Sequence, residues 1–152
     1  MLSSGEQKYC YSTEHLLDCY CRSVGRNANL LMGMAISADG LFEDEEQFEA
    51  FGNRIKEIFS NPKASCSNVR GVKAVISKKS PIQADYIVIC EDISQGHNIK
   101  EYSVFADGVK IYESNCVGHK RIIPLKNVTA KEFILCIDKY DEIPIICDFS
   151  IY

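Results

Sequence analysis

Acidic side chains gather at one point of the chain, where they could act as general acids, general bases or nucleophiles. Glu43-Asp44-Glu45-Glu46 is the only dense cluster of carboxylates, and Asp39 lies shortly before it. The cluster stands where a helix is predicted to begin, and acidic residues there interact favourably with the helix dipole. Asp39 precedes Gly40, as is typical of a turn. We therefore assign no catalytic residue, and we keep Asp39 as a candidate for substrate binding.

The histidines and their basic neighbours offer a second kind of chemistry. His15, His97 and His119 are not spaced as a metal site or a nucleophile–base pair would require. The run His119-Lys120-Arg121 could bind an anion or a sugar hydroxyl, although a polar loop entering a strand is the simpler interpretation. His119 and Arg121 remain candidates for substrate binding. We predict no metal site and no cofactor.

The chain contains eight cysteines but no C-x-x-C motif. Cys90, Cys136 and Cys147 each stand alone in an apolar, strand-like run, as small buried hydrophobic residues do. We expect most of the thiols to be free, which favours a reducing compartment. The first twelve residues, MLSSGEQKYCYS, do not read as a secretory signal, and the localisation is otherwise open.

Composition and length indicate a globular protein and argue against several other classes of protein. The chain has 152 residues, a net charge of −4 and 46% hydrophobic residues, which is typical of a globular protein. The acidic balance argues against binding nucleic acid or an anionic membrane through bulk charge. The longest apolar run, Ala28–Ile36, is shorter than the roughly 20 residues of a membrane span. The length suits one ordinary domain and is far below the roughly 250 residues of a (β/α)8 barrel.

The first part of the chain has a helical pattern. A helix is predicted over Thr13–Val24, with Gly25 as its C-cap. The continuous apolar run Asn29–Ala35 predicts a strand buried on both faces. A turn follows, and Glu43–Glu46 opens a second helix that Asn61-Pro62 ends. Helix, buried strand and helix form the unit of a parallel α/β structure, but this unit has no parallel neighbours here.

From Lys63 onward the pattern changes to short strands separated by turns, which indicates an antiparallel sandwich. Asp107-Gly108 is a strong signal for a two-residue hairpin, and Ser80-Pro81 is predicted to be a turn. The predicted strands are Gly71–Ser77, Tyr86–Glu91, Ile99–Ala106, Val109–Glu113, Lys120–Leu125, Phe133–Asp138 and Ile145–Tyr152.

Several stretches resemble glycoside hydrolase family 29, the α-L-fucosidases. Ser23–Leu41 is similar to the family pattern S-V-G-x-N-x-N-L-L-L-N-I-x-P followed by a turn. Glu91–Gly96 resembles E-x-I-x-x-G-Q, and Val117–Ile123 resembles I-G-Y-K-R-I. Pro144–Tyr152 resembles the closing P-x-I-x-x-F-x-x-Y. These matches occur in the family's order and extend over nearly the whole chain.

The resemblance implies a mostly β fold. An antiparallel, jelly-roll-like β-sandwich would be preceded by a helix–strand–helix remnant of a (β/α)8 barrel. Residues 1–62 would be the end of the catalytic barrel, and residues 63–152 the C-terminal sandwich. The upstream part of the family has no counterpart in the chain.

The family hydrolyses α-L-fucosides with retention, which requires two carboxyl groups about 5–5.5 Å apart. No position here matches the family's nucleophile or fucose-binding histidines, so the resemblance carries over no catalytic residue. Gly33, Ala35 and Ile36 also depart from the family pattern, as do His97-Asn98 and His119. A tryptophan that the family carries near residues 109–112 is absent.

Three functions stay open, and whether the chain is an enzyme is left undecided. The first is a C-terminal fragment of a fucosidase, inactive alone. The second is a non-catalytic sandwich that binds a carbohydrate, with a fucosylated glycan as the expected partner. The third is an interaction piece that docks on another chain carrying the remainder of the barrel, because exposed apolar surface and sheet edges invite association.

Overall fold

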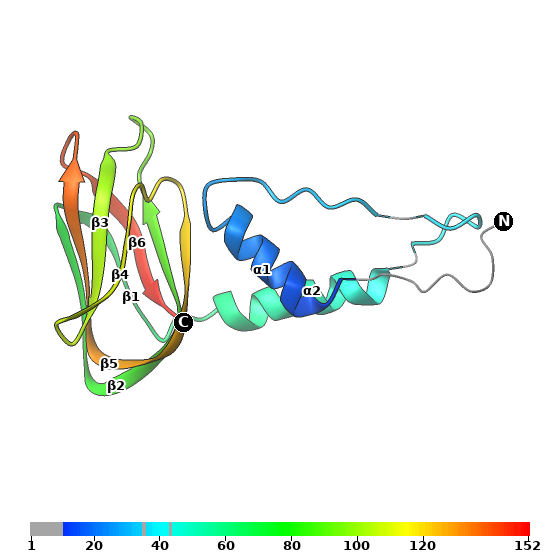
Figure 1. Ribbon diagram of the computed structural model, residues 1–152, viewed down its shortest axis with the longest axis horizontal. Helices are drawn as coiled ribbons and strands as arrows, with labels where there is room; N and C mark the ends of the chain where they lie inside the picture. The colour runs from blue at the N-terminus through cyan, green and yellow to red at the C-terminus, as the bar shows by residue number, and fades with distance from the viewer. Residues whose placement is uncertain (1–10, 35, 43) are drawn as a thin grey trace.

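The computed structural model describes residues 11–34, 36–42 and 44–152, with two helices at one end and a β-sandwich at the other (Figure 1). α1 covers Thr13–Ser23 and α2 covers Glu45–Phe59. The Ser12 hydroxyl caps α1 by accepting a 3.2 Å hydrogen bond from the His15 amide. These bounds confirm both predicted helices. Neither helix is long and apolar enough to cross a membrane.

The predicted buried strand Asn29–Ala35 is wrong. Residues 28–34 form an extended segment without strand pairing, and Ala35 lies outside the described residues. Side chains of this segment are open to solvent, with Leu31 95% and Met34 56% exposed. A parallel strand needs hydrogen-bonding neighbours and helices over both faces, and no described part of the chain supplies them. We call the described residues 28–42, without Ala35, the apolar arm.

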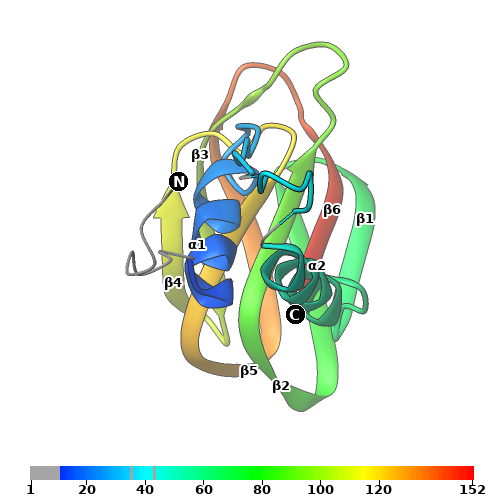
Figure 2. The same cartoon turned by 90° about the vertical axis from the view of Figure 1, so that its right-hand side faces the viewer.

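The sheet has six antiparallel strands in the order β1-β6-β2-β5-β3-β4. Their bounds are β1 Ala64–Arg70, β2 Lys73–Glu91, β3 Ile99–Ala106, β4 Val109–Ser114, β5 Arg121–Tyr140 and β6 Ile145–Ile151. The sheet folds on itself into a sandwich, and the helices lie in front of β2 and β5 when viewed from their end of the molecule (Figures 1 and 2). The fold class is therefore the predicted one, except for the remnant's strand.

Two long strands replace four of the predicted short ones. β2 joins the segments Gly71–Ser77 and Tyr86–Glu91, and β5 joins Lys120–Leu125 and Phe133–Asp138. Ser80-Pro81 is not a turn; it lies inside β2 where the register with β5 shifts between Ser77 and Ile82. An irregularity of this kind accommodates a proline, which cannot donate to the ladder.

The remaining strands show what local sequence can and cannot specify. The pattern did not predict β1, which pairs with β6 along the sheet's edge. The hairpin at Asp107-Gly108 is confirmed, because both residues have positive φ values of 46° and 81°. The Asp107 carboxylate also accepts hydrogen bonds from the backbone amides of Lys131 and Glu132, at 3.0 and 2.9 Å. The turn is thereby tied to β5.

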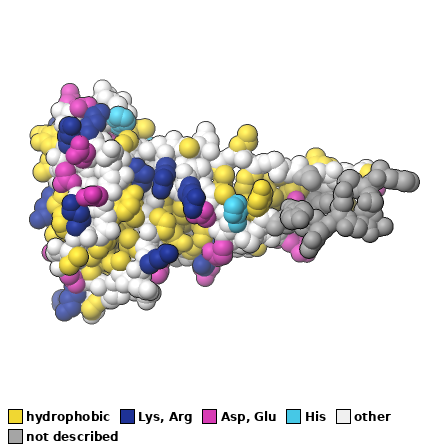
Figure 3. Space-filling model, in the orientation of Figure 1, with side chains coloured by type: hydrophobic (Ala, Val, Ile, Leu, Met, Phe, Trp, Pro, Cys, Tyr) yellow, Lys and Arg dark blue, Asp and Glu magenta, His cyan; other side chains and the backbone are white. Residues whose placement is uncertain are grey.

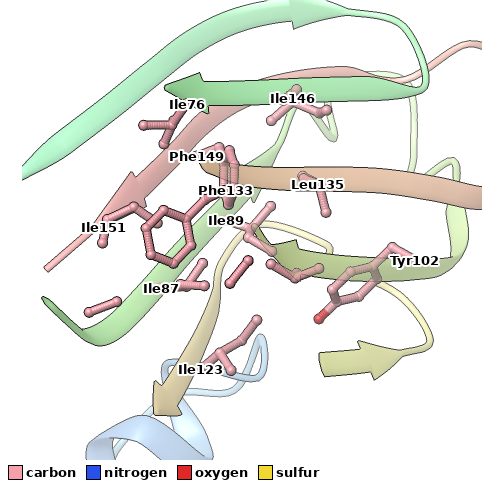
Figure 4. Packing of buried hydrophobic residues seen from close by; sticks show 14 of the residues in the cluster. Ile76, Ile87, Ile89, Tyr102, Ile123, Phe133, Leu135, Ile146, Phe149 and Ile151 are labelled. Atoms are coloured by element: carbon pink, nitrogen blue, oxygen red, sulfur yellow. The ribbon is translucent and has the colours of Figure 1, made fainter. Parts of the chain in front are cut away.

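The sandwich encloses one large core of aliphatic and aromatic side chains (Figure 4). Phe133, Phe149, Leu135, Ile87 and Ile89 are fully buried in it. Truncating one of these phenylalanines to alanine is expected to destabilise the fold by about 3–5 kcal/mol. The helices lie outside this core.

A second, smaller cluster attaches the helices to the outer face of the sheet. Leu17 and Cys21 of α1 pack on Val88 of β2 and Ile122 of β5. Phe59 of α2 adds edge contacts to the rings of Tyr86 and Tyr152.

Burial raises the pKa of the Cys21 thiol to about 11, and the negative charge of Asp18 adds to this effect. The seven described cysteines form no disulfide, and Cys10 lies outside the described residues.

Candidate functional site

The three residues predicted to bind substrate do not form one site. Asp39 lies in an exposed turn, where the Gly40 amide donates a 3.0 Å hydrogen bond to the Ser37 carbonyl and Gly40 has a φ of 75°. This turn is at the end of the apolar arm farthest from the sandwich, whereas His119 and Arg121 belong to the sandwich (Figure 1). The structure therefore separates Asp39 from the other two.

Arg121 forms hydrogen bonds to the loop between β4 and β5. Its Nη2 atom donates to the backbone carbonyls of Asn115 and Cys116, at 2.9 and 2.8 Å. His119 is exposed and lines a hollow of about 610 Å³ between α1, α2 and the start of the arm. The polar-loop interpretation of these residues thus agrees with their contacts.

The acidic cluster is the start of α2, as its position in the sequence suggested. Asp44 is the N-cap residue, and Glu45 and Glu46 occupy the first turn. Glu43 lies outside the described residues. The carboxylates there are placed to interact with the helix dipole.

Residues from three of the stretches that carry the family resemblance meet at the junction of the helices with the sandwich. Asn27 is central to it. Its side-chain nitrogen donates to the Val117 carbonyl at 2.9 Å, and its side-chain oxygen accepts from the Lys120 amide at 2.9 Å. Asn27 has a φ of 65°, in the left-handed region that asparagine tolerates better than most residues. One side chain therefore fixes both edges of the 117–120 loop.

Two glycines allow the close approach at this junction. The Ile122 amide donates to the Gly25 carbonyl at 3.0 Å. A β-carbon on Gly25 would overlap the Cys21 carbonyl oxygen and lie 2.7 Å from the Ile122 β-carbon. A β-carbon on Gly118 would lie 2.5 Å from the Asn27 amide nitrogen. Gly25 is therefore needed for this close contact. The C-cap residue of α1 is Val24 rather than the predicted Gly25, and the left-handed backbone conformation occurs at Asn27.

The buried carboxylate of Glu91 connects the junction to a second loop of the sandwich. Glu91 is only 3% exposed. One of its carboxylate oxygens accepts from the amides of Asn98 and Ile99, at 2.5 and 3.0 Å, and the other accepts from the Gly118 amide at 3.2 Å. Three amide donors compensate the buried charge, as burial requires. Glu91 thereby links the 92–98 loop to the 116–120 loop.

The sequence places these residues in family motifs but did not predict that they contact one another. Gly25, Asn27, Glu91 and Gly118 all fall within the stretches that resemble the family. Their spacing along the chain gave no hint that they meet, because two of the contacts span 90 residues or more. The one local signal was the pair Gly25 and Asn27 shortly after a predicted helix, because these residue types allow close contacts and left-handed backbone.

The surfaces beside the junction are apolar. The 610 Å³ hollow is lined partly by Tyr20, Phe51, Ile55 and Leu30. A second hollow, of about 290 Å³, lies between the arm and the helices. Yellow hydrophobic patches are visible over this part of the molecule in Figure 3. Such surfaces bind other apolar surfaces. Among the described residues, no group of three His, Cys, Asp or Glu side chains could hold a metal ion.

Comparisons with solved structures give close matches, whereas no family model and no curated protein matches the chain. A Bacteroides thetaiotaomicron protein assigned as an alpha-L-fucosidase is 30% identical, with a TM-score of 0.87 over 93% of this chain and 34% of its own. A second structure from that organism, assigned likewise, is 29% identical, with a TM-score of 0.81 over 93% of this chain and 40% of its own.

The fold also recurs in a Ruminococcus gnavus family 29 fucosidase whose structure contains fucose. The two chains are 22% identical, with a TM-score of 0.81 over 93% of this chain and 37% of that one. The chain thus spans about a third of the length of the structures that it matches.

Proposed function

The chain corresponds to the C-terminal portion of the glycoside hydrolase family 29 α-L-fucosidases, and on this basis we propose that it completes such an enzyme. The helices and the apolar arm would complete a catalytic barrel, and the sandwich would stabilise it by packing against the helices. The remainder of the barrel would come from upstream sequence or from another chain. The reaction of the assembled enzyme would be the retaining hydrolysis of α-L-fucosides.

The exposed apolar arm is the observation that carries this proposal. Leu31, Met34 and Ile36 are 95%, 56% and 72% exposed, although their run has the pattern of a strand buried on both faces. Burying apolar surface is worth about 25 cal/mol per Å², so such a run is unfavourable in water. Parallel neighbouring strands would satisfy both its backbone and its side chains.

The 152-residue chain is proposed to be inactive alone. Retaining hydrolysis needs a nucleophile and a general acid/base on opposite sides of the scissile bond. The resemblance supplies neither, and the candidate residues Asp39, His119 and Arg121 do not lie together. The candidates have the contacts of turn and loop residues.

Activity measurements test the proposal. The chain alone should not hydrolyse nitrophenyl α-L-fucoside. Activity should appear when Tyr11 is preceded by the upstream barrel portion of the 30%-identical Bacteroides relative. In that fusion, Leu31→Asp should abolish hydrolysis. Val109→Asp, at a hydrophobic side chain 66% exposed on the β3–β4 hairpin, is the matched control and should not. Turnover by the chain alone, or full activity of the Leu31→Asp fusion, would contradict the proposal.

A further inference from the structure

A polar hollow of about 530 Å³ lies along β3, β4 and the end of β5, away from the helices. Its wall combines carboxylates, a hydroxyl, an amide and an aromatic ring. Its lining includes Glu101, Ser103, Phe105, Glu113, Asn115 and Asp138. This mixture of hydrogen-bonding groups and one ring is what a polyhydroxylated ligand with an apolar face requires.

The carboxylates in the hollow are oriented by neighbours. The hydroxyl of Ser103, a residue that is only 4% exposed, donates to an Asp138 oxygen at 2.6 Å. Lys110 donates to Glu113 at 2.9 Å, and this ammonium group lowers the pKa of the Glu113 carboxyl. Ionised, oriented carboxylates are strong acceptors for hydroxyl donors.

The charge of the hollow selects among sugars. Glu101, Glu113 and Asp138 bring three negative charges. Lys110 pairs with Glu113 at 2.9 Å and Lys139 pairs with Glu101 at 3.7 Å, so the negative charge of Asp138 is in excess. The negative excess repels carboxylated and sulfated sugars. Phe105 is half-buried and presents a ring on which the C–H face of a pyranose can lie.

From this geometry we infer that the hollow is a binding site for a neutral sugar ring. The carboxylates and Asn115 would bind the hydroxyls, and Phe105 would bind the apolar face. This site goes beyond the proposed completion of a barrel, since every residue that forms it lies in the sandwich.

Nuclear magnetic resonance titration of the full chain tests the inference. Fucose, galactose, glucose and mannose are added separately, with glucuronic acid as the charged comparison. At least one neutral sugar should produce saturable amide shifts at residues 101–105, 110–115 and 138, and glucuronic acid should produce none. Asp138→Asn should weaken that binding at least tenfold, and Phe105→Ala should do the same.

Asp148→Asn is the matched control. Asp148 also accepts a hydrogen bond from a serine hydroxyl, that of Ser150 at 2.5 Å, but it does not line the hollow. This variant should bind the sugar as the unchanged chain does. The inference is overturned if no neutral sugar shifts these amides, or if Asp138→Asn and Asp148→Asn weaken binding equally. Neither result depends on hydrolytic activity, so the proposed enzyme function is tested separately.

Discussion

The side chain of Asn27 donates a 2.9 Å hydrogen bond to the carbonyl of Val117, across 90 residues of sequence. Asn27 follows α1, and Val117 lies in the loop before β5. This bond, together with the one from Lys120 to Asn27, joins the helices to the sandwich. The motif residues around Asn27 and Gly118 therefore have a structural role that is independent of any substrate.

Replacing Asn27 with alanine should destabilise the chain by about 1–3 kcal/mol, because a carbonyl and an amide lose their partner. Urea unfolding measures the change. Asn29→Ala, at an exposed position on the arm, is the control and should fall within about 0.5 kcal/mol of the unchanged chain. Equal stability of the Asn27→Ala and Asn29→Ala variants would show that the junction contributes little.

Gly25→Ala should destabilise the chain by about 1–3 kcal/mol, since the new methyl group overlaps the Cys21 carbonyl and crowds Ile122. Gly52→Ala is the matched control within α2. A β-carbon there meets nothing within 4 Å, so this variant should gain about 0.5–1 kcal/mol from helix propensity. Thermal unfolding of the two variants should shift in opposite directions; a shift in the same direction would argue against the close approach.

Glu91→Gln tests the buried carboxylate. Glutamine has one side-chain oxygen, so it cannot accept from Asn98, Ile99 and Gly118 together as the carboxylate does. We expect a loss of about 1–3 kcal/mol. Amide exchange at Ile99 and Gly118 should accelerate more than exchange in the Asp107-Gly108 hairpin. Uniform acceleration would instead indicate a global loss of stability.

Stability should fall between pH 9 and about 11 because of two buried thiols. Burial raises the pKa of Cys21 and of Cys90 to about 11, whereas the ordinary value is 9.0. The unfolded chain releases these protons first, so rising pH favours unfolding over this window. The double variant Cys21→Ala, Cys90→Ala should show a shallower decline in urea midpoint. An unchanged slope would contradict the assignment.

Local rules predicted the elements whose residues interact nearby in sequence. α1 is stabilised by residues that are local to it, the N-cap Ser12 and the first-turn Glu14. Asp107-Gly108 specified a hairpin by its backbone preference. Long-range geometry was beyond those rules. The length of β2 depends on pairing with β5, so Ser80-Pro81 looked like a turn although the partner strand continues past it.

In the apolar arm the strand prediction is wrong because the described chain lacks the partner strands that such a pattern requires. Leu30, Leu31 and Met32 have the sequence of a buried strand, but strand formation needs neighbouring strands that the described chain does not contain. The contacts of a candidate site residue could not be predicted for a related reason. Arg121 looked available for a ligand, and only the folded structure shows its Nη2 atom donating to the carbonyls of Asn115 and Cys116.

Hydrogen exchange of the amides of residues 29–34 tests whether the apolar arm is a strand of a catalytic barrel. These amides should exchange at nearly unprotected rates in the chain alone. They should become strongly protected, by at least a hundredfold, in the fusion that carries the upstream barrel portion, because parallel strands would then pair with the arm. Equal and rapid exchange in both proteins would show that the arm does not pair with neighbouring barrel strands, and would contradict the proposed function.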